Sequence, residues 1–224
     1  MSIFNQIYQR MYQTTIPDEP VCQVCQRPIE LNRQFMDIPC LCQSCAQAMQ
    51  KVKKVYKIDG IHWYVLYVYT DFLERLWFQL KEQKDIVLAS LFLADEDVDL
   101  RSYCVCAMPS SEQKRLNRGF EPILEVFRNT GIDVYSPLYK TANIKQSNQP
   151  KAKRQEIQDV LQLKSCYWMP NKPILLVDDV CTTGATLSKA CTLLSTSKVF
   201  IISAHPLWMA SQQPNEVANA PWIW

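Results

Sequence analysis

The chain has 224 residues, enough for one domain, or one domain with a small attachment, at about 100 to 200 residues per domain. Hydrophobic residues make up 48% and charged residues 21%, so the chain is expected to bury a core, and wholesale disorder is excluded. The 24 basic and 22 acidic residues leave a net charge of +2, too little for the whole surface to attract nucleic acid. The sequence has no apolar run of the roughly 18 to 20 residues that a membrane helix needs and no secretory segment, which predicts a cytoplasmic protein without membrane insertion.

Glycine is scarce, with four residues where average usage near 7% would give about sixteen. The three-glycine dinucleotide loop and the Walker phosphate loop both need closely spaced glycines, and the sequence contains neither. The common NAD-binding and P-loop ATPase classes are therefore excluded.

Half of the ten cysteines lie between Cys22 and Cys45. Cys22 with Cys25, and Cys42 with Cys45, form two C-x2-C pairs separated by sixteen residues, a spacing typical of structural zinc. Four thiolates complete a tetrahedron with no open position, so such a site is structural rather than catalytic. Cys40 is a fifth thiol that could replace Cys42. A disulfide pair or merely packed cysteines are the alternatives, and reducing cytosol disfavours the disulfides. The sequence predicts an N-terminal segment, 1–55, with a four-cysteine zinc finger.

From Gly60 onward, short apolar runs alternate with longer amphipathic ones, which predicts an α/β domain over 56–224 with a mainly parallel sheet. In chain order we expect a strand over 61–69, helices over 71–83 (capped by Asp71) and 86–94, a strand over 103–108, a helix over 119–129, and an edge strand over 134–139. A helix from Pro150 to about Leu163, a core strand over 174–177, a loop and helix over 178–194, and a strand over 199–204 follow. The tail from Pro206 carries aromatics without a period and is expected either to dock on the domain or to await a partner.

A basic segment lies between the expected edge strand and the next helix. It has five positive charges and no negative one: Lys140, Lys145, Lys151, Lys153 and Arg154. Two interpretations stay open. The segment is either a solvated loop or a track for single-stranded nucleic acid, with Tyr135 and Tyr139 as stacking platforms.

The most specific run in the sequence is 174–186. A hydrophobic strand ends in Asp178 and Asp179, followed by a turn rich in hydroxyls, from Thr182 to Thr186, and then a helix. Adjacent carboxylates can accept hydrogen bonds from the vicinal hydroxyls of a ribose. The amides and hydroxyls of the turn can bind a phosphate, helped by the helix dipole. Gly184 permits a close backbone approach.

This run resembles the phosphoribosyl pyrophosphate (PRPP) motif of type I phosphoribosyltransferases. Together with the cysteine pairs, Lys81, and Pro109-Ser110 leading to Arg118-Gly119-Phe120, the chain resembles the ComF family of competence proteins, specifically the ComFC type. The resemblance implies a phosphoribosyltransferase-like α/β fold with a parallel sheet flanked by helices and an N-terminal zinc finger. It also implies uptake of single-stranded DNA during natural transformation with a ComFA-type ATPase, in the cytoplasm beside a membrane DNA-uptake complex.

Carried over by position, the resemblance assigns the ribose and 5-phosphate to Asp178, Asp179, Thr182, Thr183, Gly184, Ala185 and Thr186, and the pyrophosphate side to Ser110, Ser111, Arg115 and Arg118. Lys81 and the two acids would be the catalytic set. We expect PRPP binding, and the alternative is an active transferase with an unknown acceptor, in which magnesium would accompany PRPP and Lys81 would stabilise departing charge.

Overall fold

The computed structural model describes residues 20–29, 41–94, 96–141 and 160–224. The chain forms two compact units, Met1–Ala48 and Met49–Trp224. In the described part of the first unit, the helix α2 (Gln43–Ala48) follows a short knuckle that begins at Pro20. Within the described ranges, no helix combines the length and apolar character that crossing a bilayer requires.

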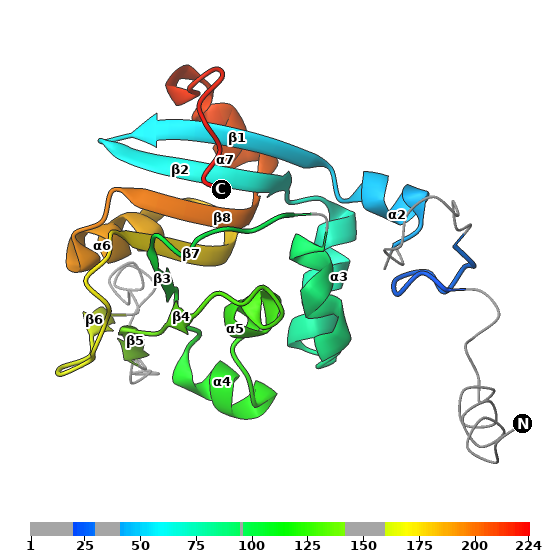
Figure 1. Cartoon of the computed structure of the whole chain (residues 1–224), viewed down its shortest axis with the longest axis horizontal. Coiled ribbons are helices and arrows are strands. Elements are labelled where there is room, and N and C mark those ends of the chain that lie inside the picture. Colours follow the sequence, from blue (N-terminus) through cyan, green and yellow to red (C-terminus); the bar gives the residue numbers. More distant parts are fainter. Residues whose placement is uncertain (1–19, 30–40, 95, 142–159) are drawn as a thin grey trace, which may run out of the picture. The chain divides into compact units, whose positions relative to one another are not determined.

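The second unit is built on a six-stranded sheet with the order β1-β2-β8-β7-β3-β4 (Figure 1). Its strands are β1 (Lys51–Ile58), β2 (Ile61–Val68), β3 (Cys104–Ala107), β4 (Val134–Tyr135), β7 (Ile174–Cys181) and β8 (Lys198–Ala204). Only the β1–β2 pair among these is antiparallel. A separate antiparallel ribbon joins β5 (Leu138–Thr141) to β6 (Val160–Leu163). The sequence-based prediction of a mixed α/β fold with a mostly parallel sheet flanked by helices is confirmed.

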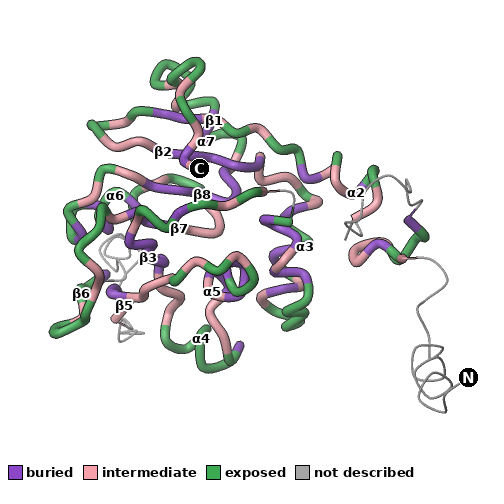
Figure 2. The backbone as a smooth tube through the Cα atoms, viewed as in Figure 1, coloured by how far each residue is buried: buried purple, intermediate pink, exposed green. Residues whose placement is uncertain are grey.

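Helices lie between these strands and after the last of them. They are α3 (Asp71–Lys81), the 3-10 helix η1 (Ile86–Leu93), α4 (Glu112–Arg118), α5 (Pro122–Phe127), α6 (Ala185–Leu194), α7 (Pro206–Ser211) and the short 3-10 helix η3 (Gln213–Asn215). Strand β8 is buried at every residue after Lys198, and β7 is buried over 175–177 and at Cys181 (Figure 2), as expected of parallel strands covered on both faces. Helix α3 turns Leu73, Leu76, Trp77 and Leu80 inward.

Several element boundaries differ from the sequence-based predictions. The N-cap of α3 is Thr70, not Asp71, because the Thr70 hydroxyl accepts a hydrogen bond from the Leu73 amide. Gly119 ends α4 with a left-handed φ of 89°, so the following helix begins only at Pro122. Residues 86–93 form a 3-10 helix.

The helix predicted from Pro150 to Leu163 is wrong at its described end. Residues 160–163 pair with β5 as a strand, and 142–159 lie outside the described residues. Strand β1 and helix α4 have no counterpart in the prediction. In β1 the alternation of lysine with apolar residues is broken by a bulge between Lys51 and Lys54, which hides the period of two.

The aromatic tail docks on its own unit. Trp208 is almost fully buried, with its ring centroid 5.6 Å from that of Tyr56 and 5.5 Å from that of Trp63. Farther along, Trp224 packs edge-on against Phe200, and its indole N–H donates to Glu96 at 3.1 Å. Of the two alternatives for the tail, docking on the domain is the one observed.

Candidate functional site

The candidate site lies where strand β7 extends beyond the end of strand β3. Strand β3 ends at Ala107, opposite Val177, whereas β7 continues beside β8 as far as Cys181. The chain leaves β3 toward β4 on one side and leaves β7 toward β8 on the other, so the sheet order diverges at this point. Open α/β sheets bind ligands in the crevice at the carboxyl ends of such strands. A cavity of about 350 Å³ opens here.

Most of the residues predicted for the phosphoribosyl site line this one cavity. They are Lys81, Ser110, Ser111, Arg118, Asp178, Asp179, Thr182, Thr183, Gly184 and Thr186. Ala185 and Arg115 do not line it, and Arg115 is exposed on α4. Lys114 lines the cavity instead, one helical turn before Arg118. The spacing of four residues between Lys114 and Arg118, which places two side chains on one helix face, could have identified it.

Only one of the five residues predicted for the basic track lies within the described residues. Lys140, on β5, lines the cavity. The other predicted members, Lys145, Lys151, Lys153 and Arg154, lie outside the described residues. Cys40, the alternative thiol for the zinc finger, lies outside them as well.

Lys81 and Asp179, which both line the cavity, form an ion pair. The Lys81 Nζ atom lies 2.5 Å from Asp179 Oδ2, and both side chains are about one-fifth exposed, at 21% and 22%. The same ammonium lies 4.7 Å from the centroid of the Trp77 ring, within the range of a cation–π contact. Lys81 is the last residue of α3, where the helix dipole also favours a cation.

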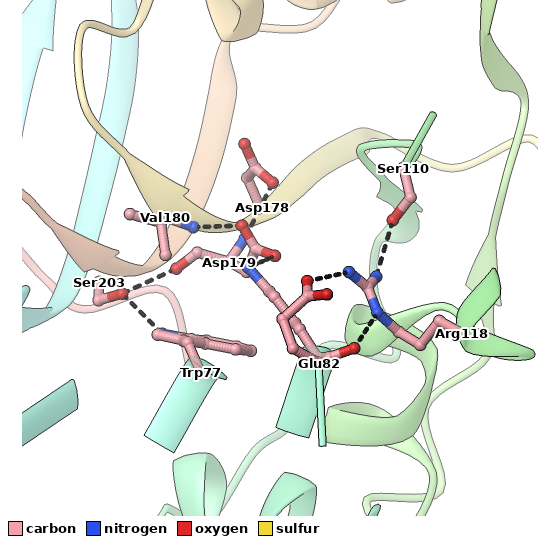
Figure 3. A network of polar contacts seen from close by, with 9 residues as sticks. Trp77, Glu82, Ser110, Arg118, Asp178, Asp179, Val180 and Ser203 are labelled. Carbon is pink, nitrogen blue, oxygen red and sulfur yellow. Dashed lines mark hydrogen bonds and ion pairs between the residues drawn. The ribbon is translucent and has the colours of Figure 1, made fainter. Parts of the chain in front are cut away.

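Each of the two acids also accepts a hydrogen bond from the next backbone amide. Asp178 Oδ1 accepts from the Asp179 amide at 2.9 Å, and Asp179 Oδ1 accepts from the Val180 amide at 2.6 Å (Figure 3). Burial and then the adjacent charge of Asp179 raise the pKa of Asp178 to about 8. This shift favours the protonated carboxyl group of Asp178, which can donate as well as accept a hydrogen bond.

A buried relay connects the acid pair to helix α3. The Trp77 indole N–H donates to Ser203 Oγ at 3.1 Å, and Ser203 Oγ donates to the Asp179 carbonyl at 2.9 Å (Figure 3). Ser203 is fully buried on β8, paired with Val180. This relay fixes the helix that carries Lys81 relative to the strand that carries Asp179.

Arg118 joins the pyrophosphate-side loop to the end of α3. Its Nε donates to the Lys81 carbonyl at 2.8 Å, and its terminal nitrogens reach Ser110 Oγ at 3.4 Å and Glu82 Oε1 at 3.5 Å (Figure 3). The Arg118 side chain is 5% exposed. Much of its hydrogen-bonding capacity is thus used within the protein, which makes it a positioning group for Ser110 and Lys81.

The first unit brings four cysteines together. The sulfurs of Cys22, Cys25, Cys42 and Cys45 all lie within 4.8 Å of one another, and those of Cys25 and Cys42 are 3.6 Å apart. Zinc–sulfur bonds of about 2.3 Å place tetrahedral thiolates roughly 3.8 Å apart, so this donor set fits a structural zinc ion. The sequence-based prediction of a four-cysteine cluster is confirmed, and the cluster is compatible with zinc.

The pKa values of Cys42 and Cys45 differ in a way that a bound cation would even out. A hydrogen bond with the Ser44 hydroxyl is the largest influence on Cys42 and lowers its pKa to about 6. Burial, with the neighbouring thiols, raises the pKa of Cys45. Without a cation the four thiols cannot all ionise at close range, and a divalent ion would remove that repulsion.

The parallel sheet, the polar cavity at its carboxyl edge and the separate four-cysteine cluster define a mixed α/β protein with a zinc-finger-like unit. Two known proteins are similar to the chain in sequence. Competence protein ComFC of Streptococcus pneumoniae is 26% identical over 138 residues, 60% of this chain and 62% of that protein. Competence protein ComFC of Bacillus subtilis is 22% identical over 206 residues, 85% of each. The two likenesses support assignment to the ComFC-type competence protein family. No protein-family model matches the chain.

Proposed function

We propose that the cavity at the carboxyl ends of β3 and β7 binds PRPP or a closely related phosphoribosyl ligand. One observation carries the proposal: the acid pair of β7 and the turn from Thr182 to Thr186 line the same cavity. Its volume of about 350 Å³ lies within the usual range for a small-molecule site. Groups that suit a ribose, a 5-phosphate and a pyrophosphate therefore all line one cavity.

Each part of the wall has a separate task in this proposal. Asp178 and Asp179 hydrogen-bond the ribose hydroxyls, and the 182–186 turn presents amides and hydroxyls to the 5-phosphate. Gly184 has a φ of 78°, a left-handed conformation that aims successive amides in a way L-residues rarely adopt. Lys114, Lys140 and Ser110 lie in the remaining wall and suit the pyrophosphate oxygens.

Calorimetric titration tests this proposal. PRPP is expected to bind, ribose 5-phosphate and pyrophosphate to bind more weakly, and Asp178→Asn with Asp179→Asn to reduce PRPP affinity by about 100-fold, as expected for two lost hydrogen bonds to a ligand. Asp59→Asn, in the exposed β1–β2 turn, is the matched control. Equal PRPP affinities for the acid-pair variant and the control would contradict the proposal.

Transfer of the phosphoribosyl group is the second candidate function. The observation that favours it is the set of cations around the cavity: Lys81 on α3, Lys114 and Arg118 on α4, and Lys140 on β5. Such cations can stabilise a departing pyrophosphate. Release of pyrophosphate on incubation with PRPP, magnesium and a panel of nucleobases would support turnover, and PRPP binding without any release would leave a binding protein.

The likeness to two competence proteins supports a role for this chain in competence. We further propose single-stranded DNA and a ComFA-type ATPase as its partners, on the family resemblance of the sequence motifs. Exposed aromatics on the β5–β6 side suit stacking with bases. Trp168 is 73% exposed, Tyr139 is exposed on β5, and Lys164 lies 5.3 Å from the Tyr167 ring centroid.

A salt titration tests the DNA proposal. The affinity for an oligo-dT strand is expected to fall as salt rises, with a log–log slope of about −0.7 per phosphate contact. Trp168→Ala is expected to weaken binding by about tenfold, since stacking on one base contributes about 1 to 3 kcal/mol. Leu207→Ala, at an equally exposed apolar side chain on α7, is the control. A flat salt dependence would contradict DNA binding.

A further inference from the structure

The acid pair is poorly suited to binding a divalent cation, although magnesium is the usual companion of PRPP. Magnesium requires near-octahedral oxygen ligands at about 2.0 to 2.1 Å and is commonly held by one or two protein carboxylates together with substrate phosphates. Asp179 and Asp178 are the acids on the strand tip, and Glu82 and Glu121 also line the cavity. Whether magnesium fits depends first on whether the two strand-tip carboxylates are available.

Asp179 is already neutralised by a cation of the protein. Its Oδ2 lies 2.5 Å from Lys81 Nζ, and its Oδ1 accepts the Val180 amide at 2.6 Å. Each oxygen keeps a lone pair that a ribose hydroxyl can use. A magnesium ion there would instead bring two positive charges next to an ammonium group, and like charges at such range repel strongly.

Lys81 is held at this position by several contacts. Its ammonium lies over the Trp77 ring, and its carbonyl accepts Arg118 Nε at 2.8 Å. Trp77 is itself anchored to Ser203 and stacked on Phe92, with ring centroids 3.9 Å apart. Lys81 therefore differs from a surface lysine that could swing away when a metal approaches.

Asp178 offers no better ligand. Its Oδ1 accepts the Asp179 amide at 2.9 Å, and burial together with the adjacent Asp179 charge raises its pKa, which favours the neutral acid over the carboxylate. A neutral carboxyl group can hydrogen-bond a hydroxyl but is a weak ligand for a hard cation. Neither strand-tip acid thus fits magnesium.

We infer that Lys81 serves as the built-in counter-cation of Asp179, so that this cavity binds its phosphoribosyl ligand without magnesium. The inference rests on the proposed function of the cavity. Lys114 and Lys140 line the same cavity, and their ammonium groups are the cations that can bind the phosphoryl oxygens. Charge neutralisation that a metal would otherwise supply thereby comes from Lys81 at Asp179 and from Lys114 and Lys140 at the phosphates.

Calorimetry with PRPP in excess EDTA and in excess magnesium tests the inference. For the wild-type chain the two dissociation constants are expected to agree within about threefold. Lys81→Met, which keeps the side-chain length and removes the charge, is expected to lose about tenfold or more in EDTA and to regain part of it with magnesium, because Asp179 is then free to hold the metal. Lys57→Met, at an exposed position on β1, is the matched control and should behave as wild type.

Lys81→Arg provides a second variant if Lys81→Met is unstable, since it keeps the charge and should stay insensitive to magnesium. Binding of PRPP to the wild-type chain only in magnesium would overturn the inference and leave the proposed function standing. Absence of PRPP binding in both buffers would overturn the proposed function itself. The two failures are therefore distinguishable in one set of titrations.

Discussion

Gly184 packs directly against Trp208. A Cβ atom at Gly184 would lie 3.1 Å from Trp208 Nε1 and 3.3 Å from a ring carbon of Trp63. The phosphate-loop turn on β7 and the tail helix α7 thus share one contact. The turn needs glycine for its left-handed φ of 78° and for lack of space.

Gly184→Ala is therefore expected to destabilise the protein by about 2 kcal/mol or more and to weaken PRPP binding, because the turn must move. Gly131→Ala is the matched control, since Gly131 also has positive φ, at 70°, but has open space around its Cβ position. It should lose only the backbone contribution of about 1 to 2 kcal/mol. Urea unfolding of both variants gives the comparison, and equal losses would show that the contact with Trp208 is unimportant.

The second prediction concerns zinc. Cys22→Ser or Cys25→Ser is expected to lower the metal bound per chain from about one zinc ion toward zero, because a tetrahedral site needs all four thiolates. Cys166→Ser is the control, since that thiol is exposed and outside the cluster. Elemental analysis of the purified chain measures the result. Zinc content unchanged in the Cys22 and Cys25 variants would contradict the assignment of the ligands.

The parts of the candidate site that could be predicted from the sequence are those whose residues lie close together in the chain. The acids, the turn and the cysteine pairs are each contained in a short run, so local chemistry sufficed to predict them. Lys114 and the relay through Ser203 depend on contacts between distant segments: Ser203 follows Trp77 by 126 residues. A buried serine within an apolar strand is visible in the sequence, but its partners are not.

Secondary structure was missed for a similar reason. Residues 160–163 form β6 only because they pair with β5, and a four-residue strand carries too short a pattern to be distinguished from a helix end. Helix α4 has few apolar residues and is exposed on most of its surface, so it lacks the hydrophobic period that identifies longer helices.

The third prediction is a pH dependence that originates at Asp178. The pKa of Asp178 is about 8 in the folded chain and 3.8 for the ordinary group. At pH values between these two, the folded state holds a proton that the unfolded state has already released. Stability contributed by the protonated group is therefore lost as the pH rises from about 4 to about 8 and is level above that. Asp179, Lys81 and Lys140 are the charged groups that act on Asp178, and the charge of Asp179 adds to the effect.

Asp178→Asn removes this loss. From about pH 5 to about pH 8 the wild-type chain is expected to lose unfolding free energy that the Asp178→Asn variant keeps. The variant should therefore gain more than about 1.4 kcal/mol relative to the wild-type chain over this range, the equivalent of one pKa unit. Denaturant unfolding at several pH values measures it. A difference that stays constant with pH would show that Asp178 has an ordinary pKa.

The last prediction concerns the buried relay between Trp77 and Ser203. Ser203→Ala leaves both the Trp77 indole N–H and the Asp179 carbonyl without their partner, at a cost of about 1 to 3 kcal/mol for each unsatisfied group. Trp77→Phe removes the donor but also reduces the stacking on Phe92. Because the second substitution removes one of the groups that the first leaves unpaired, the double variant should lose less than the sum of the two single losses, by about 1 kcal/mol.

A double-mutant cycle in urea measures this coupling. Ser90→Ala is the control for the loss of a serine hydroxyl, because the Ser90 hydroxyl donates to the Val87 carbonyl at an exposed position and its loss should change stability by less than about 0.5 kcal/mol. Strict additivity in the cycle would mean that Trp77 and Ser203 act independently. Because the relay also positions Lys81, Ser203→Ala should weaken PRPP binding more than Ser90→Ala does. A loss of stability without a loss of affinity would separate the two roles of the relay and assign it to folding alone.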